Sequence, residues 1–250
     1  MNENLYKYLM MLGDNAMILG HRLSELCGHG PSLETDIALT NIALDLYGQV
    51  RSYFQYAAEL GGEEVTEDTI AFLRKERAYL NVVLVEQPNT DFAHVVARQY
   101  FYDLFQSLLI PGLVDSSDER IAAIAAKAQK ESKYHLRFST EWMKRLGAGT
   151  SESKQKMQLA IDHLFPFTQE FFTVTPVEQE MTVQGMGPDV SSMKDAYCTH
   201  VEALLSSVGL QVPDAAPRVV KGKLGIHSEH MGYILNELQY MQRAYPQMEW

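Results

Sequence analysis

Apolar residues recur every three to four positions along most of the chain, which is the period of an amphipathic α-helix. Residues 4–27, 33–60, 91–113 and 116–147 are the longest stretches with this spacing. No stretch keeps the strict alternation of apolar and polar residues that is typical of a half-buried strand. We therefore expect an all-α protein whose four longest helices form two hairpins.

Caps, valines and prolines predict where the other elements begin and end. Thr66, followed by two acidic residues, predicts the N-cap of a short helix that ends near Arg77. Three valines disfavour helix and predict an extended segment over residues 81–89. Pro111 is expected to kink or end the third long helix. The C-terminal part is expected to hold a helix over 152–172 bent at Pro166, an irregular stretch over 173–190, a helix ending at Gly209, a loop over 209–225 and a helix over 226–244.

The order of these elements suggests a particular architecture. The two hairpins are separated by a connection of about thirty residues, which is the connectivity of a ferritin-like four-helix bundle with one long crossover. The later helices would then be C-terminal additions to that bundle. Nothing in the composition marks a domain boundary, so we expect residues 1–250 to form a single ferritin-like domain.

Charge and cysteine content narrow the possible partners. The net charge is −11, and such a surface repels phosphate backbones and acidic lipids, so we expect neither nucleic acid nor a membrane as a partner. The chain has no run of eighteen apolar residues and no basic-then-apolar pattern at its start. Its two cysteines, Cys27 and Cys198, fit a reducing compartment, so we expect a cytoplasmic protein.

Acidic side chains on the four long helices match part of a two-metal template. In bundles with a two-metal carboxylate site, one helix of each pair supplies a lone carboxylate and the other supplies Glu-x-x-His. Asp14, Asp45, Asp103 and Glu131 occupy comparable positions, with similar spacing within each hairpin. The three aspartates lie among apolar neighbours, where a charge is costly unless it is paired or hydrogen-bonded.

The histidines of the template are missing. Asp45 is followed three residues later by Gly48, and Glu131 is followed at the same spacing by Tyr134. His135 comes one position late and is turned about 100° around the helix. At most four of the six ligands remain and none is imidazole, so we expect no metal at this frame and no catalytic residue. The acids would instead be satisfied by hydrogen bonds from Asn41, Gln99, Tyr134 or arginine neighbours.

Six stretches along the chain are informative when they are taken together. They are Leu12–Asn15, Ala43–Gln49, Leu84–Asn89, Ala97–Phe101, Lys130–Phe138 and Gly225–His230. Jointly they resemble the C subunit family of phenylacetyl-CoA 1,2-epoxidase, and the match runs nearly end to end. The resemblance implies a bacterial multicomponent oxygenase of aerobic phenylacetate breakdown. In that complex a related A subunit holds a di-iron site and epoxidises the ring of phenylacetyl-CoA with O2 and reducing equivalents.

The same resemblance implies a role for this chain. The C subunit is ferritin-like and metal-free, and it pairs with the di-iron A subunit to hold it in shape. The leading hypothesis is therefore a non-catalytic structural subunit without a cofactor of its own. One alternative is an oxygenase with a reduced carboxylate metal site on the four acids. Another is an iron-storage bundle, although nothing in the chain suggests a shell-forming assembly.

A basic cluster after the short third helix is a candidate substrate contact. Residues 74–77 could be a solvated helix C-terminus, where cations are favoured, or a contact for the phosphates of coenzyme A. The resemblance links the residues after the Glu-Arg pair with the CoA substrate and places a second contact near residues 179–181, whose types do not match the family. The candidates are Arg74, Arg77, Ala78, Tyr79, Leu80, Asn81, Gln179, Glu180 and Met181.

Two further patterns each allow two interpretations. His227 and His230 could be zinc ligands if a third ligand came from elsewhere, or a hydrogen-bonded pair at a helix start. The first two helices are apolar on more than one face, which predicts either a partner interface or cover by later helices. The residues concerned are Tyr6, Met10, Met17, Leu39, Leu46, Tyr47, Tyr53, Phe54 and Tyr56.

Overall fold

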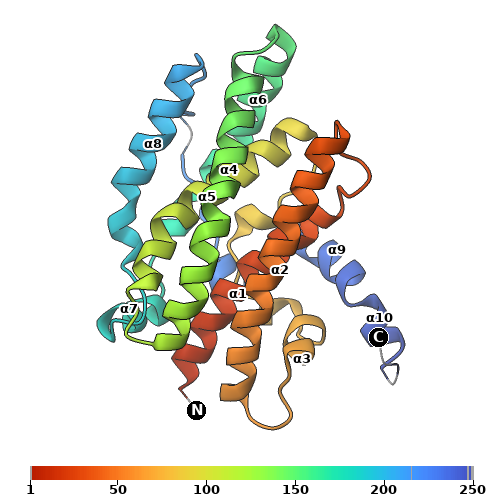
Figure 1. Cartoon of the computed structure of the whole chain (residues 1–250), viewed down its shortest axis with the longest axis vertical. Helices are drawn as coiled ribbons and strands as arrows, with labels where there is room; N and C mark the ends of the chain where they lie inside the picture. The colour runs from red at the N-terminus through yellow and green to blue at the C-terminus, as the bar shows by residue number, and fades with distance from the viewer. Residues whose placement is uncertain (1, 215, 247, 249–250) are drawn as a thin grey trace. The chain divides into compact units, whose positions relative to one another are not determined.

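The computed structural model describes residues 2–214, 216–246 and 248, and the regular elements of this part of the chain are helices joined by loops (Figure 1). Its only β-type pairing is an isolated bridge between Lys221 and Ile226, and the described residues form no strand. The expected all-α class is confirmed. The α-helices are α1 (Glu3–Ser24), α2 (Leu33–Gly61), α3 (Glu67–Phe72), α4 (Phe92–Val114), α5 (Glu119–Gly147), α6 (Ser151–Leu164), α7 (Pro176–Val183), α8 (Lys194–Ser207), α9 (Glu229–Leu238) and α10 (Tyr240–Ala244).

Helix N-termini are capped by short polar side chains, and the cap predicted at Thr66 is among them. The Thr66 and Thr69 side chains form a reciprocal capping box at the start of α3, with bonds of 3.1 and 2.9 Å to each other's backbone N–H. Asn2, Ser32, Asp91, Asp118, Thr150 and Ser228 accept backbone N–H bonds at the starts of their helices.

Two local expectations are wrong, and one of the two outcomes expected at Pro111 is excluded. The apolar run expected to be extended forms a 3₁₀ turn at Val83–Glu86, because its side chains are buried and tertiary packing outweighs the preference of valine. Pro111 does not end α4, which continues to Val114 with Leu113 buried. The stretch expected to be irregular contains α7, whose start is a capping box of Thr175 and Glu178 with Pro176 at the first position.

The chain divides into two compact units. The first comprises residues 1–86 and 220–250 and contains α1, α2, α3, α9 and α10. The second comprises residues 87–219 and contains α4 to α8. Within the first unit α1 and α2 pack side by side, and within the second α4 and α5 do so (Figure 1).

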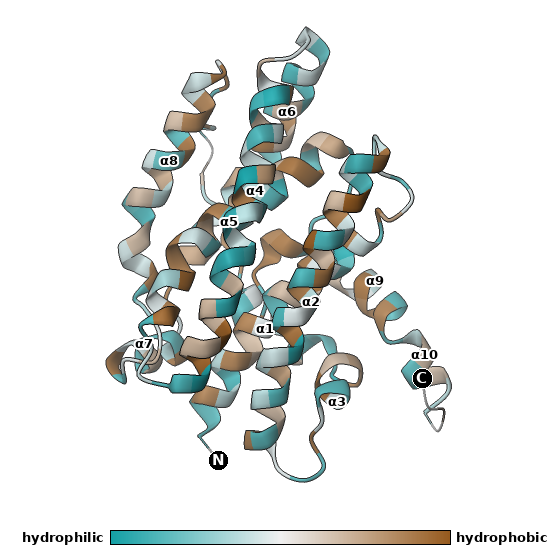
Figure 2. Cartoon of the chain, in the orientation of Figure 1, coloured by the Kyte–Doolittle hydropathy of each residue, from teal (hydrophilic) through white to brown (hydrophobic). Residues whose placement is uncertain are grey.

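Each unit has an apolar core. In the first unit, Leu9, Ile18 and Leu23 of α1 and Ile42 of α2 are completely buried. In the second, the Phe105 and Phe171 rings stack with centroids 4.3 Å apart, and Tyr197 donates from its hydroxyl to the Phe101 carbonyl at 3.1 Å. Figure 2 shows hydrophilic and hydrophobic residues interleaved along α2, as in a helix with one buried side.

The apolar residues that suggested two covered faces are mostly covered by the chain itself. Met10, Met17, Leu39, Leu46, Tyr53 and Phe54 are at most 4% exposed, and Tyr6, Tyr47 and Tyr56 are half-buried. Of the two interpretations, cover within the chain therefore accounts for the fully buried members. The large apolar residues that α2 leaves exposed are different ones, Leu33, Ile37 and Leu44.

None of the described helices combines the length and the apolar character that a bilayer crossing requires.

Candidate functional site

The carboxylate expected to be a remnant metal ligand on α1 is bound by an arginine. Asp14 is completely buried. Arg74 donates from Nη1 to its Oδ2 at 3.0 Å and from Nη2 to its Oδ1. The backbone N–H of Leu80 donates to Oδ2 at 2.8 Å. A guanidinium therefore supplies the positive charge that a buried carboxylate needs.

Further contacts hold the Arg74 side chain in place. Its Nε donates to the Ile70 carbonyl at 2.6 Å and its Nη1 to the Ala78 carbonyl at 2.8 Å. The guanidinium lies 3.9 Å from the centroid of the Tyr79 ring, a cation–π distance. Burial lowers the pKa of Arg74, but the charge and hydrogen bonds of Asp14, with smaller contributions from Tyr79 and Tyr6, together outweigh it and the net pKa is raised. Arg74 is therefore permanently charged and committed to Asp14.

The segment that follows Arg74 is tied to α1 by side chains of that helix. The Val82 N–H donates to Asn15 Oδ1 at 2.8 Å, one residue along from the bond to Asp14. Tyr79 and Asn81 are completely buried. Backbone groups that no helix pairs must find other partners when they are buried, and here α1 provides them.

Glu86 is the centre of a second buried cluster in the same unit. Its carboxylate accepts bonds from His227 Nδ1 at 2.6 Å, the Ser228 backbone N–H at 2.8 Å, Ser228 Oγ at 2.6 Å and Asn81 Nδ2 at 2.9 Å. Arg22 of α1 donates from Nε and Nη2 to the Glu86 carbonyl oxygen at 3.0 and 2.7 Å. The start of α9 is therefore attached to the long connection through one carboxylate.

His227 uses both of its ring nitrogens. Nε2 lies 2.9 Å from the Tyr79 carbonyl oxygen while Nδ1 contacts Glu86. Two oxygen acceptors favour the doubly protonated ring. Burial lowers the pKa of His227, but the hydrogen bond to Glu86, the Glu86 charge, the bond to the Tyr79 carbonyl and the Glu76 charge together outweigh it, and the net pKa is raised. His227 is therefore a hydrogen-bonded histidine at a helix start, and the zinc interpretation is wrong for it.

Two glycines allow the C-terminal loop to approach this segment. A Cβ at Gly222 would collide with the Asn81 carbonyl oxygen, and one at Gly225 would collide with that of Arg77. Gly225 also has φ of +74°, a backbone conformation that favours glycine. The stretch Gly225–His230 thus reaches Leu84–Asn89, so two of the six resembling stretches meet at Glu86.

In the second unit, Asp103 on α4 is buried and hydrogen-bonded. Gln99 Nε2 donates to its Oδ1 at 2.7 Å and Ser139 Oγ on α5 donates to its Oδ2 at 2.8 Å. Burial raises the pKa of Asp103 to about 6, against smaller lowering effects of His135 and the two hydrogen bonds. The expectation that Gln99 satisfies this acid is confirmed.

The other positions of the predicted frame are more accessible. Asp45 and Gly48 on α2 and Glu131 on α5 are half-buried, and Tyr134 is 40% exposed. Leu44 beside Asp45 is also exposed, so the apolar surroundings expected for Asp45 are only partial.

The donor set does not fit a two-metal centre. A metal at Asp14 would have to displace Arg74 and leave a buried guanidinium without its partner, which is strongly unfavourable. Gly48 and Tyr134 stand where the template needs imidazole. The residues at these positions therefore do not match the ligand set of a di-iron centre.

The predicted substrate residues differ in accessibility. Arg77 and Ala78 in the 3₁₀ turn Glu76–Ala78 are exposed, and so is Gln179 on α7. Leu80 and Glu180 are half-buried, while Tyr79, Asn81 and Met181 have no exposed surface. Of the two arginines expected to contact CoA phosphates, Arg74 is paired with Asp14 and Arg77 is exposed.

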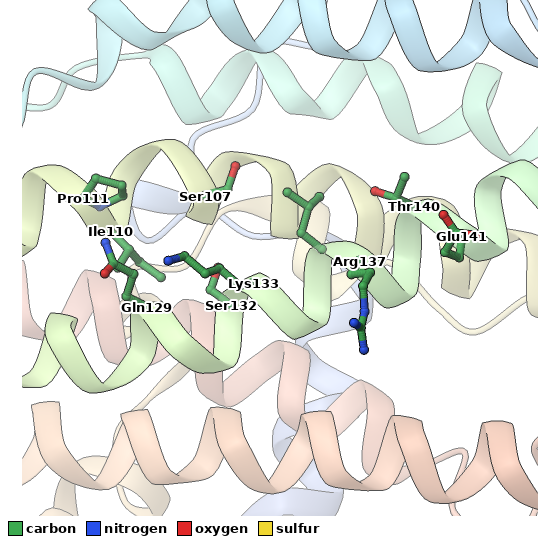
Figure 3. A pocket seen from close by; sticks show the side chains of 10 residues that line it. Ser107, Ile110, Pro111, Gln129, Ser132, Lys133, Arg137, Thr140 and Glu141 are labelled. Atoms are coloured by element: carbon green, nitrogen blue, oxygen red, sulfur yellow. The ribbon is translucent and has the colours of Figure 1, made fainter.

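A groove of about 350 Å³ runs between α4 and α5. Ile110, Pro111 and Leu136 make its walls apolar. Figure 3 shows Lys133 lying along α5 toward Gln129, whereas Arg137 extends away from them. The remaining lining residues are Ser107, Ser132, Thr140 and Glu141.

Sequence reasoning missed the roles of Glu86 and Arg22. The signal for Glu86 was present, since it is a lone acid directly after the apolar residues Val82–Val85. A charge in such a run needs a buried partner. That the partners are His227 and Ser228, far along the chain, is a matter of tertiary structure.

Comparisons with known proteins agree with the stretches singled out in the sequence. The profile of the family described as "Phenylacetic acid catabolic protein" matches residues 1–250. The chain is 47% identical over 250 residues to the C subunit of 1,2-phenylacetyl-CoA epoxidase from Escherichia coli (strain K12), covering 100% of both chains. The resemblance drawn from the six stretches is confirmed, and the chain belongs to the phenylacetic acid catabolic protein family.

Proposed function

We propose that this chain is a non-catalytic structural subunit of a multicomponent phenylacetyl-CoA epoxidase. It pairs with a di-iron catalytic A subunit and stabilises it. The observation that carries the proposal is the buried pair of Asp14 and Arg74. A carboxylate that would bind iron in a catalytic relative is here neutralised by a guanidinium of the same chain.

We also propose that the long helices α1, α2, α4 and α5 belong to one ferritin-like bundle that spans the chain as a single domain. Their lengths and order suit that architecture. In such a bundle, Asp14 and Asp103 stand at positions where related proteins have metal ligands. Here their hydrogen bonds stabilise the fold. The oxygen chemistry of the complex then resides in the partner, and this chain needs no cofactor for it.

The surface of α2 supports a partner-binding role. Leu33, Ile37 and Leu44 are 72%, 51% and 61% exposed. Their spacing of four and seven residues places them on one side of the helix. A row of large apolar side chains exposed to solvent is typical of a protein–protein contact. We propose that this row contacts the catalytic partner.

We further propose that the turn around Arg77 contributes to CoA recognition in the assembled enzyme. Arg77 and Ala78 are exposed, whereas Arg74, Tyr79 and Asn81 hold the turn against α1. An exposed guanidinium is suited to a phosphate.

Cys27 and Cys198 are both free thiols, which supports a reducing cytoplasmic location.

Reconstitution tests the structural role. The chain, the catalytic subunit and their mixture are each assayed with the reductase for epoxidation of phenylacetyl-CoA. We expect a stable complex, and turnover only from the mixture. Full activity of the catalytic subunit alone would overturn the structural role.

The alternative of a separate oxygenase makes a different prediction. Turnover by this chain without the catalytic subunit would favour it, as would an exchange-coupled pair of irons in Mössbauer spectra after ferrous reconstitution. We expect neither, because Arg74 occupies the position from which such a centre would have to be built.

A further inference from the structure

Three potential metal ligands converge in the first unit, away from Asp14 and Glu86. His21 lies in the last turn of α1, Glu25 is the C-cap of that helix four residues later, and Glu237 comes from the last turn of α9. His21 Nε2 is 3.7 Å from Glu25 Oε1 and 3.6 Å from Glu237 Oε2. One ligand atom from each of the three residues lies within 4.8 Å of the other two.

These distances are too long for hydrogen bonds but suit a shared cation. A hydrogen bond from nitrogen to oxygen usually spans about 2.7–3.2 Å. Ligands at about 2.0–2.2 Å from a tetrahedral zinc ion are separated from one another by roughly 3.3–3.6 Å. The two distances measured from His21 Nε2 are therefore close to the separations between ligand atoms around a tetrahedral zinc ion.

The ring nitrogen at the centre of the cluster has no hydrogen-bond partner. His21 Nε2 is inaccessible to solvent and forms no bond with any residue that the structure describes. The His21 side chain is 14% exposed. Leaving a buried polar atom unsatisfied costs about 1–3 kcal/mol. A metal ion between the three side chains would satisfy it.

The two carboxylates are suited to complementary roles. Arg22 Nη1 donates to both oxygens of Glu25, at 2.8 and 3.1 Å, and so orients that carboxylate. Ligating carboxylates are commonly hydrogen-bonded in this way by a neighbouring group. Glu237 is 67% exposed, which leaves the site open to solvent for entry of an ion.

We propose that His21, Glu25 and Glu237 bind a divalent transition-metal ion of the Zn²⁺ type, with water at the remaining position. The ligands are an imidazole and two carboxylates, a set that such ions accept. The ion would fasten the C-terminal end of α9 to α1, as Glu86 fastens its N-terminal end. This site is independent of the proposed structural role and takes no part in oxygen activation.

The test uses the purified full-length chain after removal of metals. Zn²⁺ is titrated against a chromophoric chelator, and Co²⁺ serves as an absorption probe of the coordination. We expect one Zn²⁺ per chain, with affinity lowered at least about tenfold by either Glu237→Gln or His21→Gln. Glu229→Gln, on the same helix but outside the cluster, is the matched control and should bind as the wild type does.

A second readout is thermal stability. Zn²⁺ should raise Tm of the wild type and of Glu229→Gln equally, and should raise that of Glu237→Gln by less at the same Zn²⁺ concentration. Glu237 is largely exposed, so its variant remains informative even if His21→Gln fails to fold. Absence of Zn²⁺ binding, or equal binding by wild type and Glu237→Gln, would overturn the proposal.

Discussion

Glu86 and His227 form a buried ion pair in which Oε1 and Nδ1 are 2.6 Å apart and both side chains are inaccessible to solvent. Glu86 is the last residue of the 3₁₀ turn Val83–Glu86 in the connection that follows α2, and His227 precedes α9. The pair attaches the C-terminal segment to the body of the first unit. Buried charges are tolerated where each is paired and further hydrogen-bonded, and both conditions hold here.

Replacing His227 should therefore destabilise the protein. His227→Ala leaves Glu86 with only its bonds to Ser228 and Asn81. Loss of a charged hydrogen bond in a buried cluster is expected to lower the free energy of unfolding by about 2–3 kcal/mol. Denaturant unfolding of the variant measures this loss. His200→Ala, at an exposed position of α8, is the control and should change little.

Removing one member of the pair formed by Asp14 and Arg74 should lower the free energy of unfolding more than removing His227 does. Arg74→Met leaves a carboxylate buried without its cation, and the free energy of unfolding is expected to fall by about 3–5 kcal/mol. Adding Asp14→Leu should recover part of the loss, because no unpaired charge then remains. A double-mutant cycle in urea measures the coupling. Additive effects of the two changes would show that the pair is not coupled.

The raised pKa of Asp103 predicts a pH-dependent stability. Its pKa is about 6 in the folded chain, against an ordinary value of 3.8, so the folded state holds its proton more tightly. Stability from this group is therefore complete below about pH 4, falls as pH rises to about 6, and then levels off. Asp103→Asn should remove this slope. We expect a gain on the order of 1–2 kcal/mol at pH 7 and none at pH 4.

The amide in Asp103→Asn can be accommodated because Gln99 can turn its side chain. Gln99 Oε1 is buried and unbonded in the described part of the chain, so after a flip it could accept from the new amide. Chemical denaturation at several pH values checks the prediction. A strong loss of stability at pH 7 would indicate that Asp103 acts in its ionised form.

A charge in the exposed row of α2 should weaken pairing with the catalytic partner. Leu44→Arg places a cation where we propose an apolar contact, and a central contact of this kind is expected to weaken affinity at least about tenfold. Leu159→Arg, at a residue of α6 that is 57% exposed, is the matched control. Titration calorimetry measures the affinity of each variant for the catalytic partner. Similar affinities for both would place the interface elsewhere.

Charge reversal at Arg77 should affect substrate use and not folding. One exposed phosphate contact contributes about 1 kcal/mol, so Arg77→Glu in the assembled enzyme should raise KM for phenylacetyl-CoA by under about tenfold. Tm of the chain should stay the same, because Arg77 is exposed. Lys194→Glu, at an exposed position of α8, controls for the change in net charge. An unaltered KM would exclude Arg77 as a contact.

Much of the secondary structure could be predicted because its causes are local. The period of apolar residues and the cap at Thr66 depend on neighbours within a few residues. The errors arose where packing decides. Val83–Glu86 became a 3₁₀ turn because its residues are buried, despite the preference of valine for extended backbone.

The sequence by itself determined the all-α class, the family and the absence of histidines at positions 48 and 134. These follow from residue identity and short-range spacing. Only the tertiary structure decided that Arg74 neutralises Asp14, that His227 reaches Glu86, and that Glu237 approaches His21. A charged residue within an apolar run of the sequence implies a buried charge that needs a partner. Many residues elsewhere in the chain could be that partner. Which residue does so depends on how helices distant in the chain pack together.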